Sequence, residues 1–222
     1  MNRIPLLILL LGFAWPAQAQ IPDGFVDMGE FLADVQIEAR YAGHGNFVGE
    51  PIDGYEAEKV LLTREAADAL LAVQIELRQI GLGLKLFDGY RPQRAVDHFV
   101  RWAQDPEDDV MKSVYYPHVD KSELFEQGYI AEQSGHSRGS AVDLTLVSLE
   151  TGEELDMGTR WDYFDPRSAP ANQEVSPQHQ ARRMLLQITM IKHGFEPLAE
   201  EWWHFKLIDE PYPDTYFDFV IE

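Results

Sequence analysis

Apolar positions recur at helical spacing in two long stretches of the chain. In residues 63–80, Thr63 takes the capping position and Gly81 follows as a stop signal. Ser-Pro at 176–177 opens the second stretch, because proline is favoured at the first helical position, and Gly194 ends it. The stripes that we expect these helices to bury are Ala66, Ala69, Leu70, Val73, Leu77 and Ile80 in the first and Ala181, Met184, Leu185, Ile188 and Ile191 in the second.

Three β-rich segments lie around these helices. Residues 82–87 alternate in part and end at an Asp-Gly turn, and residues 140–148 and 202–208 are also predicted strands. A weaker helical pattern begins at Pro92 and carries Ala95, Phe99 and Trp102. Helices and strands are mixed without a regular strand–helix repeat. This favours a single α+β domain with a mainly antiparallel central sheet flanked by helices.

Two segments interrupt this pattern. Residues 104–126 are acidic and aromatic, and residues 156–176 show no helical or strand periodicity. We expect both to be surface insertions.

The first twenty residues resemble an export signal. Arg3 precedes the apolar run 4–15, and Ala17-Gln18-Ala19 has the small-x-small pattern of a cleavage site. The run is too short to span a bilayer comfortably. We therefore expect residues 1–19 to be a cleaved signal peptide and residues 20–222 to be the mature domain. The expected location is the periplasm, with no membrane anchor after cleavage.

Composition limits the chemistry further. The 222 residues have a formal charge of -20 and contain no cysteine. The missing cysteine excludes disulfides, a thiol nucleophile and any cysteine-based metal site. Any metal must therefore be held by His, Asp or Glu. The acidic balance argues against nucleic acid as a partner, and nothing in the sequence indicates the oligomeric state.

One group of residues has the chemistry of a catalytic metal site. His136 and Asp143 are separated by turn residues that can bring both side chains to one point, although seven positions on a straight strand would place them on opposite faces. His204 supplies a third ligand from another segment. Two histidines and one carboxylate leave a coordination position open for water, as catalytic zinc requires. Glu201, three residues before His204, can reach that water and act as a base.

These motifs resemble those of the zinc D,D-peptidases that share a fold with the Hedgehog signalling domain, and most closely the D-alanyl-D-alanine dipeptidases (VanX-like). Ser-x-His-x-x-Gly-x-Ala-x-Asp stands at 134–143 and Glu-x-x-His at 201–204. Further similar segments are 37–42, 46–49, 88–92, 157–159 with Asp162, and 210–217. The resemblance extends in order over essentially the whole mature chain.

The resemblance implies roles for individual residues. His136, Asp143 and His204 correspond to the ligands of one Zn²⁺ per chain, Glu201 to the catalytic base, and Arg91 to the arginine that stabilises the transition state. The implied substrate is the small dipeptide D-Ala-D-Ala, hydrolysed to two D-alanines. The groups that would receive the substrate are Tyr41, Ser134 and Asp162. Trp161 departs from the family pattern, which usually has a smaller aromatic residue before that aspartate.

Two other functions remain open from the sequence. A D,D-carboxypeptidase acting on peptidoglycan stem peptides would use the same chemistry in a more open cleft. A non-catalytic zinc-binding module, as among the Hedgehog relatives, would not need Glu201 and Arg91. A periplasmic dipeptidase would encounter dipeptide released by cell-wall turnover, so we expect a role in recycling.

Overall fold

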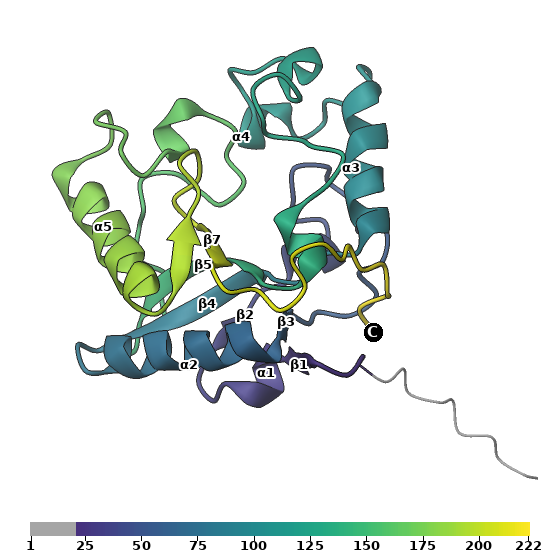
Figure 1. The fold of residues 1–222 in the computed structure, drawn as a ribbon. Coiled ribbons are helices and arrows are strands. Elements are labelled where there is room, and N and C mark those ends of the chain that lie inside the picture. Colours follow the sequence, from purple (N-terminus) through teal and green to yellow (C-terminus); the bar gives the residue numbers. More distant parts are fainter. Residues whose placement is uncertain (1–20) are drawn as a thin grey trace, which may run out of the picture.

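A five-stranded sheet runs through the middle of the computed structural model, which describes residues 21–222 (Figure 1). Its strand order is β2-β4-β5-β7-β6. β2 runs parallel to β4, and every other neighbouring pair is antiparallel. The predicted α+β fold with a mainly antiparallel sheet is confirmed. The strands are β2 (Gln36–Ile37), β4 (Leu82–Asp88), β5 (Ala141–Ser148), β6 (Phe195–Pro197) and β7 (His204–Leu207).

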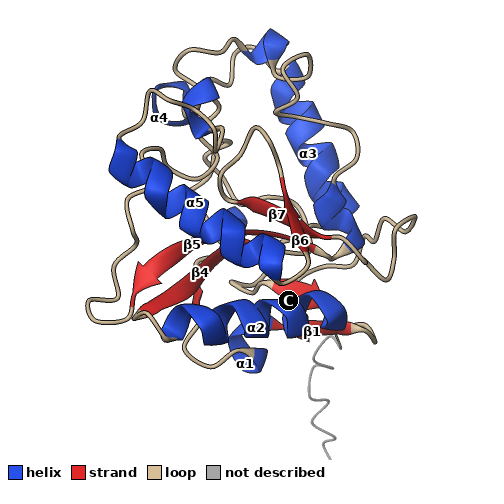
Figure 2. Ribbon diagram, turned by 60° about the vertical axis from the view of Figure 1, so that its left-hand side comes forward, coloured by secondary structure: helices blue, strands red, loops and turns tan. Residues whose placement is uncertain are grey.

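Helices lie on both sides of this sheet. In Figures 1 and 2, α1 and α2 lie below the sheet, and α3 and α4 lie above it. A small second sheet pairs β1 (Phe25–Asp27) with β3 (Leu61–Thr63). The helices are α1 (Met28–Phe31), α2 (Arg64–Arg78), α3 (Gln93–Gln104), α4 (Lys112–Tyr115) and α5 (Pro177–Lys192), with short 3₁₀ turns at Arg40–Ala42, Lys121–Glu123, Gly135–Arg138 and Pro166–Ser168.

The two faces of β4 and β5 differ in chemistry. Leu84 pairs with Leu146, and Leu86 pairs with Leu144, so these fully buried leucines share one face. Because side chains alternate along a strand, Asp143 and Thr145 point to the opposite face. An apolar core therefore fills one side of the sheet, and polar side chains are available on the other.

The first and third predicted helices are present, but α2 ends at Arg78, and Ile80 of its predicted buried stripe is 59% exposed. α2 begins directly after Thr63, but the Thr63 hydroxyl does not cap it and lies 2.7 Å from the Ser140 hydroxyl instead. This contact links the helix start to the beginning of β5. α3 begins after Pro92 and buries Ala95, Phe99 and Trp102, as predicted.

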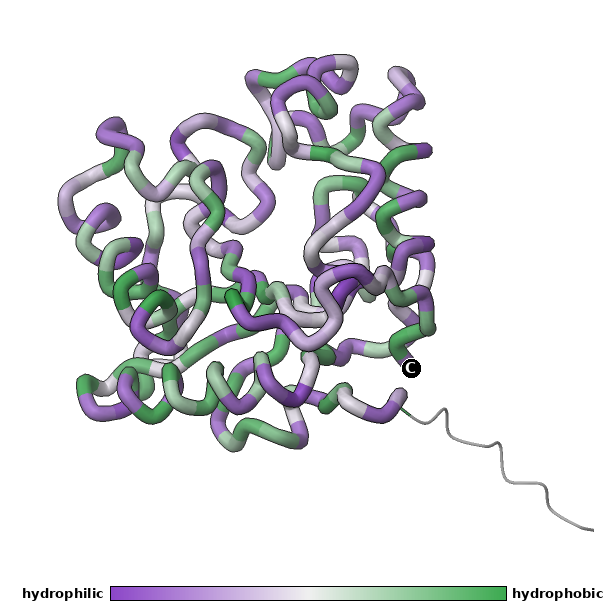
Figure 3. The backbone as a smooth tube through the Cα atoms, viewed as in Figure 1, coloured by the Kyte–Doolittle hydropathy of each residue, from purple (hydrophilic) through white to green (hydrophobic). Residues whose placement is uncertain are grey.

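The predicted buried stripe of α5 is wrong. Met184 and Ile188 are each 58% exposed and Ile191 is 50% exposed. Figure 3 shows both hydrophobic and hydrophilic residues along this helix. The buried face instead carries Arg183, Leu186, Thr189 and Met190. The Arg183 guanidinium donates to the backbone carbonyls of Met157, Arg167 and Ala169. A buried arginine that satisfies carbonyl groups of a neighbouring segment cannot be recognised from apolar spacing.

The two segments predicted as surface insertions contribute to the core, so that prediction is also wrong. Tyr115, Tyr116 and Leu124 of the first segment are buried, and so are Trp161 and Phe164 of the second. Aromatic rings of the two segments pack together, and the centroids of the Phe164 and Tyr116 rings are 6.3 Å apart. Aromatic side chains bury large apolar areas, and this outweighs the acidic residues between them.

The predicted signal peptide, residues 1–19, lies outside the described residues. Within residues 21–222, none of the helices is long and apolar enough to cross a membrane.

The corrected orientation of α5 yields a prediction with a matched control. Leu186 is fully buried, whereas Ile188 on the same helix is mostly exposed. We expect Leu186→Ala to lower the free energy of unfolding by about 2–5 kcal/mol, because it leaves a cavity. Ile188→Ala should change it by less than about 0.5 kcal/mol. Urea unfolding monitored by circular dichroism measures both, and equal losses would contradict this orientation.

Candidate metal centre and active site

Strand register places three polar side chains in a row across the central sheet. Asp143 of β5 is opposite Asp88 of β4 on one side and His204 of β7 on the other. A bulge between Leu86 and Asp88 shifts the register by one residue. Without this shift Asp88 would be opposite Val142, on the other face of the sheet. The bulge therefore brings the Asp88 carboxylate to the same face as Asp143.

A tight turn brings His136 to the same point. His136 lies in the 3₁₀ turn Gly135–Arg138, and Gly139 follows with φ of 80°, in the left-handed region. A Cβ atom at Gly139 would come within 2.3 Å of the Phe25 ring, so glycine is needed for both shape and space. The turn that the sequence predicted between His136 and Asp143 is present, and it reverses the chain just before β5.

The three predicted ligands meet with the spacing of a metal site. His136 Nε2 is 3.0 Å from His204 Nδ1 and 3.3 Å from Asp143 Oδ1, and His204 Nδ1 is 3.0 Å from the same Asp143 oxygen. In a tetrahedral zinc site with bonds of about 2.0–2.2 Å, neighbouring ligand atoms are roughly 3.3 Å apart. The triangle formed by His136, Asp143 and His204 therefore fits such an ion.

The hydrogen-bond partners also favour a cation between these groups. His136 Nδ1 is 2.7 Å from the Gly89 carbonyl oxygen, which only accepts, so this nitrogen carries the proton. In a neutral His136, Nε2 then has a lone pair directed toward His204 and the Asp143 carboxylate. A metal ion bound to both Nε2 and Asp143 Oδ1 would remove the repulsion between this lone pair and the carboxylate oxygen, which are 3.3 Å apart. A carbonyl that fixes the tautomer of a histidine is typical of metal ligands.

Asp143 is held by groups that favour its ionised form. Trp161 donates its indole N–H to Asp143 Oδ2 over 3.2 Å, and Asp143 is 2% exposed. Burial by itself raises the pKa of Asp143, but His136 and His204 reverse this effect, so the pKa lies well below its ordinary value. Asp143 is therefore a carboxylate at neutral pH and can bind a cation. The sequence analysis assigned no role to the Trp161 indole.

Arg91 is fixed by a buried carboxylate that the sequence analysis also missed. Arg91 Nε and one terminal nitrogen donate to Asp88 Oδ2 over 3.0 and 2.8 Å. The Tyr55 hydroxyl donates to the other Asp88 oxygen over 2.6 Å. The Arg91 guanidinium lies 3.8 Å from Asp143 Oδ2. The sequence does contain a signal for this role of Asp88, because this residue stands at the end of a predicted strand, three positions before the candidate Arg91.

One cavity joins the metal ligands to the predicted catalytic residues. It has a volume of about 310 Å³, and its lining includes Arg91, Ser134, His136, Asp143, Glu201 and His204. The Ser134 hydroxyl accepts a hydrogen bond from the His136 backbone N–H over 3.2 Å. Residues 128–131, which follow the segment 104–126 that was predicted as a surface insertion, also line it. The cavity therefore has room for a small molecule beside the metal ligands.

Glu201 has the electrostatic environment of a proton carrier. Burial, and then the negative charge of Asp143, raise the pKa of Glu201 to about 8. A metal cation at Asp143 would offset that charge and bring the pKa of Glu201 down. A carboxyl group whose pKa lies near neutrality can accept a proton and return it.

Tyr41 and Asp162 contact each other but are not among the residues that line this cavity. The Tyr41 hydroxyl donates to Asp162 Oδ2 over 2.6 Å, and both residues are buried. The Arg91 guanidinium carbon is 5.1 Å from the Tyr41 ring centre. Burial, and then the charge of Asp143, raise the pKa of Asp162 well above its ordinary value. Asp162 has φ of 56°, a left-handed conformation that aspartate tolerates better than most residues.

The sequence as a whole places this chain among the peptidases. The sequence model of peptidase family M15, described as D-Ala-D-Ala dipeptidase, matches residues 22–222. The chain therefore belongs to the D-Ala-D-Ala dipeptidase family.

Similar proteins with curated names agree with this assignment. The D-alanyl-D-alanine dipeptidase of Enterococcus faecalis is 47% identical over 199 residues, which is 90% of this chain and 98% of the relative. The protein of the same name from Streptomyces coelicolor is 47% identical over 197 residues, 89% of this chain and 96% of the relative. That from Escherichia coli is 36% identical, over 82% of this chain and 83% of the relative.

A solved structure is also similar, at a lower level. It is VanYB in complex with D-Ala-D-Ala, with 14% identity and a TM-score of 0.42 over 68% of this chain and 74% of that one.

The contact between Trp161 and Asp143 predicts an effect on metal binding. Trp161→Phe removes the indole N–H that orients this carboxylate, and losing such a partner typically weakens metal affinity about 10-fold or more. Trp202→Phe is the matched control, because its indole N–H donates to Thr159 instead. Competition with a chromophoric zinc chelator measures both affinities. Equal affinity of the wild type and Trp161→Phe would contradict a role for this hydrogen bond.

Proposed function

We propose that this protein is a zinc-dependent dipeptidase that hydrolyses D-Ala-D-Ala to two D-alanines. The observation that carries the proposal is that His136, Asp143 and His204 converge at hydrogen-bonding distances in a cavity that Glu201 and Arg91 also line. Membership of the dipeptidase family and the names of relatives at 47% identity support the choice of substrate.

One Zn²⁺ would be held by His136, Asp143 and His204. When bound, the ion supplies Lewis acidity, which lowers the pKa of a coordinated water and polarises the scissile carbonyl. Three protein ligands leave a position open for this chemistry. The chain provides the remaining functions through Glu201, Arg91 and the residues around them.

Glu201 would act first as a base and then as an acid. In this mechanism its carboxylate takes a proton from the attacking water and later gives that proton to the amine of the departing D-alanine. Both transfers suit a carboxyl group that shares the cavity with the metal ligands and whose pKa is raised by burial. Such acid–base help typically contributes about 10²–10⁴ in rate.

Arg91 would stabilise the negative charge that develops on the carbonyl oxygen. Its guanidinium lines the cavity, and Asp88 fixes it through Nε and one terminal nitrogen. Asp88 is in turn held by the Tyr55 hydroxyl, so the arginine is oriented before substrate arrives. Preorganised donors stabilise a transition state because they do not have to reorient during the reaction.

The family resemblance supports Asp162 and Tyr41 as the groups that would receive the ammonium group of the dipeptide, although neither is among the residues that line the cavity, and Ser134, which lines it, would lie close to the bound substrate. An ammonium group beside Asp162 would favour ionisation of a carboxyl group whose pKa is raised by burial. An N-acylated substrate has no ammonium and would leave this buried group without a charged partner. The proposed site therefore selects a free dipeptide over a longer peptide.

We also propose that residues 1–19 direct export to the periplasm, where the enzyme would recycle dipeptide released by cell-wall turnover. The support is the apolar run followed by Ala17-Gln18-Ala19. The mature protein isolated from periplasmic extract should begin at Gln20. Recovery of an uncleaved chain from the cytoplasm would contradict the proposal.

The proposed role of Glu201 predicts a separation of metal binding from turnover. Glu201→Gln should keep one zinc per chain and lose about 10²–10⁴ in kcat on D-Ala-D-Ala. Glu200→Gln is the matched control, because Glu200 is the adjacent acid, is exposed and does not line the cavity. Metal content by mass spectrometry and release of D-alanine give the two readouts. Undiminished turnover in Glu201→Gln would overturn this role.

The proposed ammonium site predicts the substrate range. Free D-Ala-D-Ala should be cleaved with a kcat/KM at least about 100-fold above that of N-acetyl-D-Ala-D-Ala, since the acylated amine cannot pair with Asp162. Asp162→Asn should narrow this ratio by lowering activity on the free dipeptide. Equal cleavage of both substrates by the wild type would favour a D,D-carboxypeptidase. Bound zinc without turnover of any dipeptide would favour a non-catalytic module.

A further inference from the structure

The outer side of α5 is apolar, although the inner side of this helix is the one that packs on the protein. The buried Leu186 and Met190 lie on the inner side. Figure 2, which brings α5 to the front, shows no other helix or strand of the described chain over its outer side. The exposed apolar residues form a stripe, which consists of Pro177, Ala181, Met184, Ile188 and Ile191.

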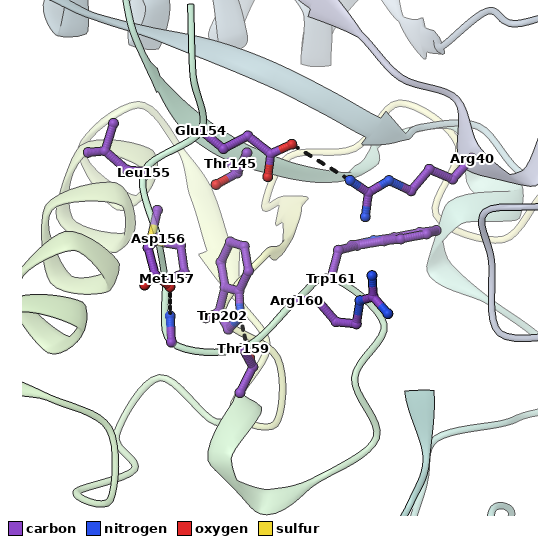
Figure 4. A pocket seen from close by; sticks show the side chains of 11 residues that line it. Arg40, Thr145, Glu154, Leu155, Asp156, Met157, Thr159, Arg160, Trp161 and Trp202 are labelled. Carbon is purple, nitrogen blue, oxygen red and sulfur yellow. Dashed lines mark hydrogen bonds and ion pairs between the residues drawn. The ribbon is translucent and has the colours of Figure 1, made fainter. Parts of the chain in front are cut away.

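Polar contacts on the inner side fix the orientation of α5. Arg183 is 1% exposed and, besides its bonds to backbone carbonyls, donates to the Thr159 hydroxyl over 3.3 Å. Thr159 in turn accepts a hydrogen bond from the Trp202 indole over 2.9 Å, a contact that Figure 4 shows. Turning the helix to bury its apolar stripe would leave these buried polar groups without partners. The stripe therefore stays exposed in a single copy of the chain.

The spacing within the stripe is that of a helix that pairs with another helix. Its members follow one another at intervals of four, three, four and three residues, which is the a/d pattern of a coiled coil. Such a stripe packs against a second helix of the same spacing. Among the helices of residues 21–222, none covers it, so the matching helix belongs to another molecule.

Charge distinguishes this face from the rest of the protein. The chain has a formal charge of -20, so two copies repel each other over most of their surfaces. α5 contains no Asp or Glu in its 16 residues. A groove of about 510 Å³ lies between α5 and the segments 170–173 and 197–199, and none of the residues that line it is charged. A second copy of the chain can therefore approach this face with little repulsion.

We propose that this face is the interface of a symmetric dimer, in which α5 packs antiparallel against α5 of a second copy. A two-fold axis brings the same patch of both copies together, so one self-complementary stripe is sufficient. With the axis near the middle of the stripe, Met184 of each copy lies opposite Ile188 of the other. Antiparallel packing keeps the two Lys192 side chains at opposite ends, and the two helix dipoles run in opposite directions.

Leu198 extends the interface beyond the helix. It is 38% exposed and lines both the groove and the catalytic cavity. Specific interfaces bury at least about 1,000 Å² in total, so the apolar rim of the groove has to contribute area beside the helix. The interface therefore lies next to the catalytic cavity and does not include the metal ligands. Each chain has a complete core of its own, so folding does not require the dimer.

Sedimentation velocity of the zinc-loaded protein tests the dimer at concentrations from about 1 μM to about 1 mM, which bracket the dissociation constants of weak dimers. The mass should rise from that of one chain to that of two. Ile188→Glu should raise the dissociation constant at least about 100-fold, because each dimer would bury two unpaired carboxylates. Ile75→Glu is the matched control, since Ile75 is 52% exposed on α2, outside this face. Circular dichroism checks folding, and Met184→Gln replaces Ile188→Glu if that variant is unfolded.

The absence of cysteine permits a test of the antiparallel arrangement. Gln187 lies near the middle of the stripe and close to the two-fold axis, so Gln187→Cys should form a disulfide-linked dimer on oxidation in air. Gln178 lies at the start of α5. Antiparallel packing separates its two copies by roughly 24 Å, at 1.5 Å per residue. Gln178→Cys should therefore stay unlinked, because a disulfide requires Cα atoms within about 7 Å of each other.

The outcomes are distinct. A dimer that is lost in Ile188→Glu and kept in Ile75→Glu, with linking through Gln187→Cys alone, supports the proposal. A wild type that stays monomeric up to about 1 mM overturns it. A dimer that survives both Ile188→Glu and Met184→Gln, or that Ile75→Glu weakens equally, also overturns it. Linking through Gln178→Cys would show that the helices are not antiparallel and would reject this interface. None of these measurements depends on turnover of D-Ala-D-Ala, so the proposed function is tested separately.

Discussion

The negative charge of the buried Asp143 carboxylate is compensated by the groups that surround it. His136 and His204 contact one of its oxygens, and Trp161 and Arg91 approach the other. A buried carboxylate is unfavourable unless such partners compensate for the loss of water. Each partner comes from a different part of the chain: a 3₁₀ turn, β7, the long loop between β5 and α5, and the turn between β4 and α3. The partners of this carboxylate therefore connect the central sheet to the segments that cover it. Because the buried charge needs these partners, the groups that can bind a cation stay together in the middle of the fold.

The register of three strands sets the geometry around that carboxylate. β5 carries Asp143 between β4 and β7, so neighbours on both sides face it at the short distance between paired strands. The bulge in β4 is what moves Asp88 to this face, and Asp88 then fixes Arg91. One extra residue in one strand thus decides whether the arginine is held beside the metal ligands. Bulges near active sites commonly redirect a side chain in this way.

Burial also explains how neighbouring acids can have different properties. Asp143 has cationic or hydrogen-bonding partners and stays ionised, whereas the partly buried Glu201 and the buried Asp162 near it hold protons more strongly. Glu201 and Asp162 do not share the partners that stabilise the Asp143 carboxylate. The negative charge of Asp143 therefore raises the pKa values of both residues. The ionised Asp143 is therefore suited to binding a metal, whereas Glu201 and Asp162 are suited to exchanging protons or receiving a cationic group.

The sequence by itself determined the α+β class and the long helices and strands, because these depend on local periodicity. It also determined the three residues that meet as a candidate metal site, because they stand in motifs with short spacing. It misassigned the buried face of α5, where Arg183 is buried by bonds to distant carbonyls, and it placed Tyr116 and Phe164 on the surface although they pack in the core. It gave no role to Asp88 or to the Trp161 indole. Only the tertiary structure decided these points, because each depends on a partner far away in sequence or on a one-residue shift in strand pairing, and neither leaves a local pattern.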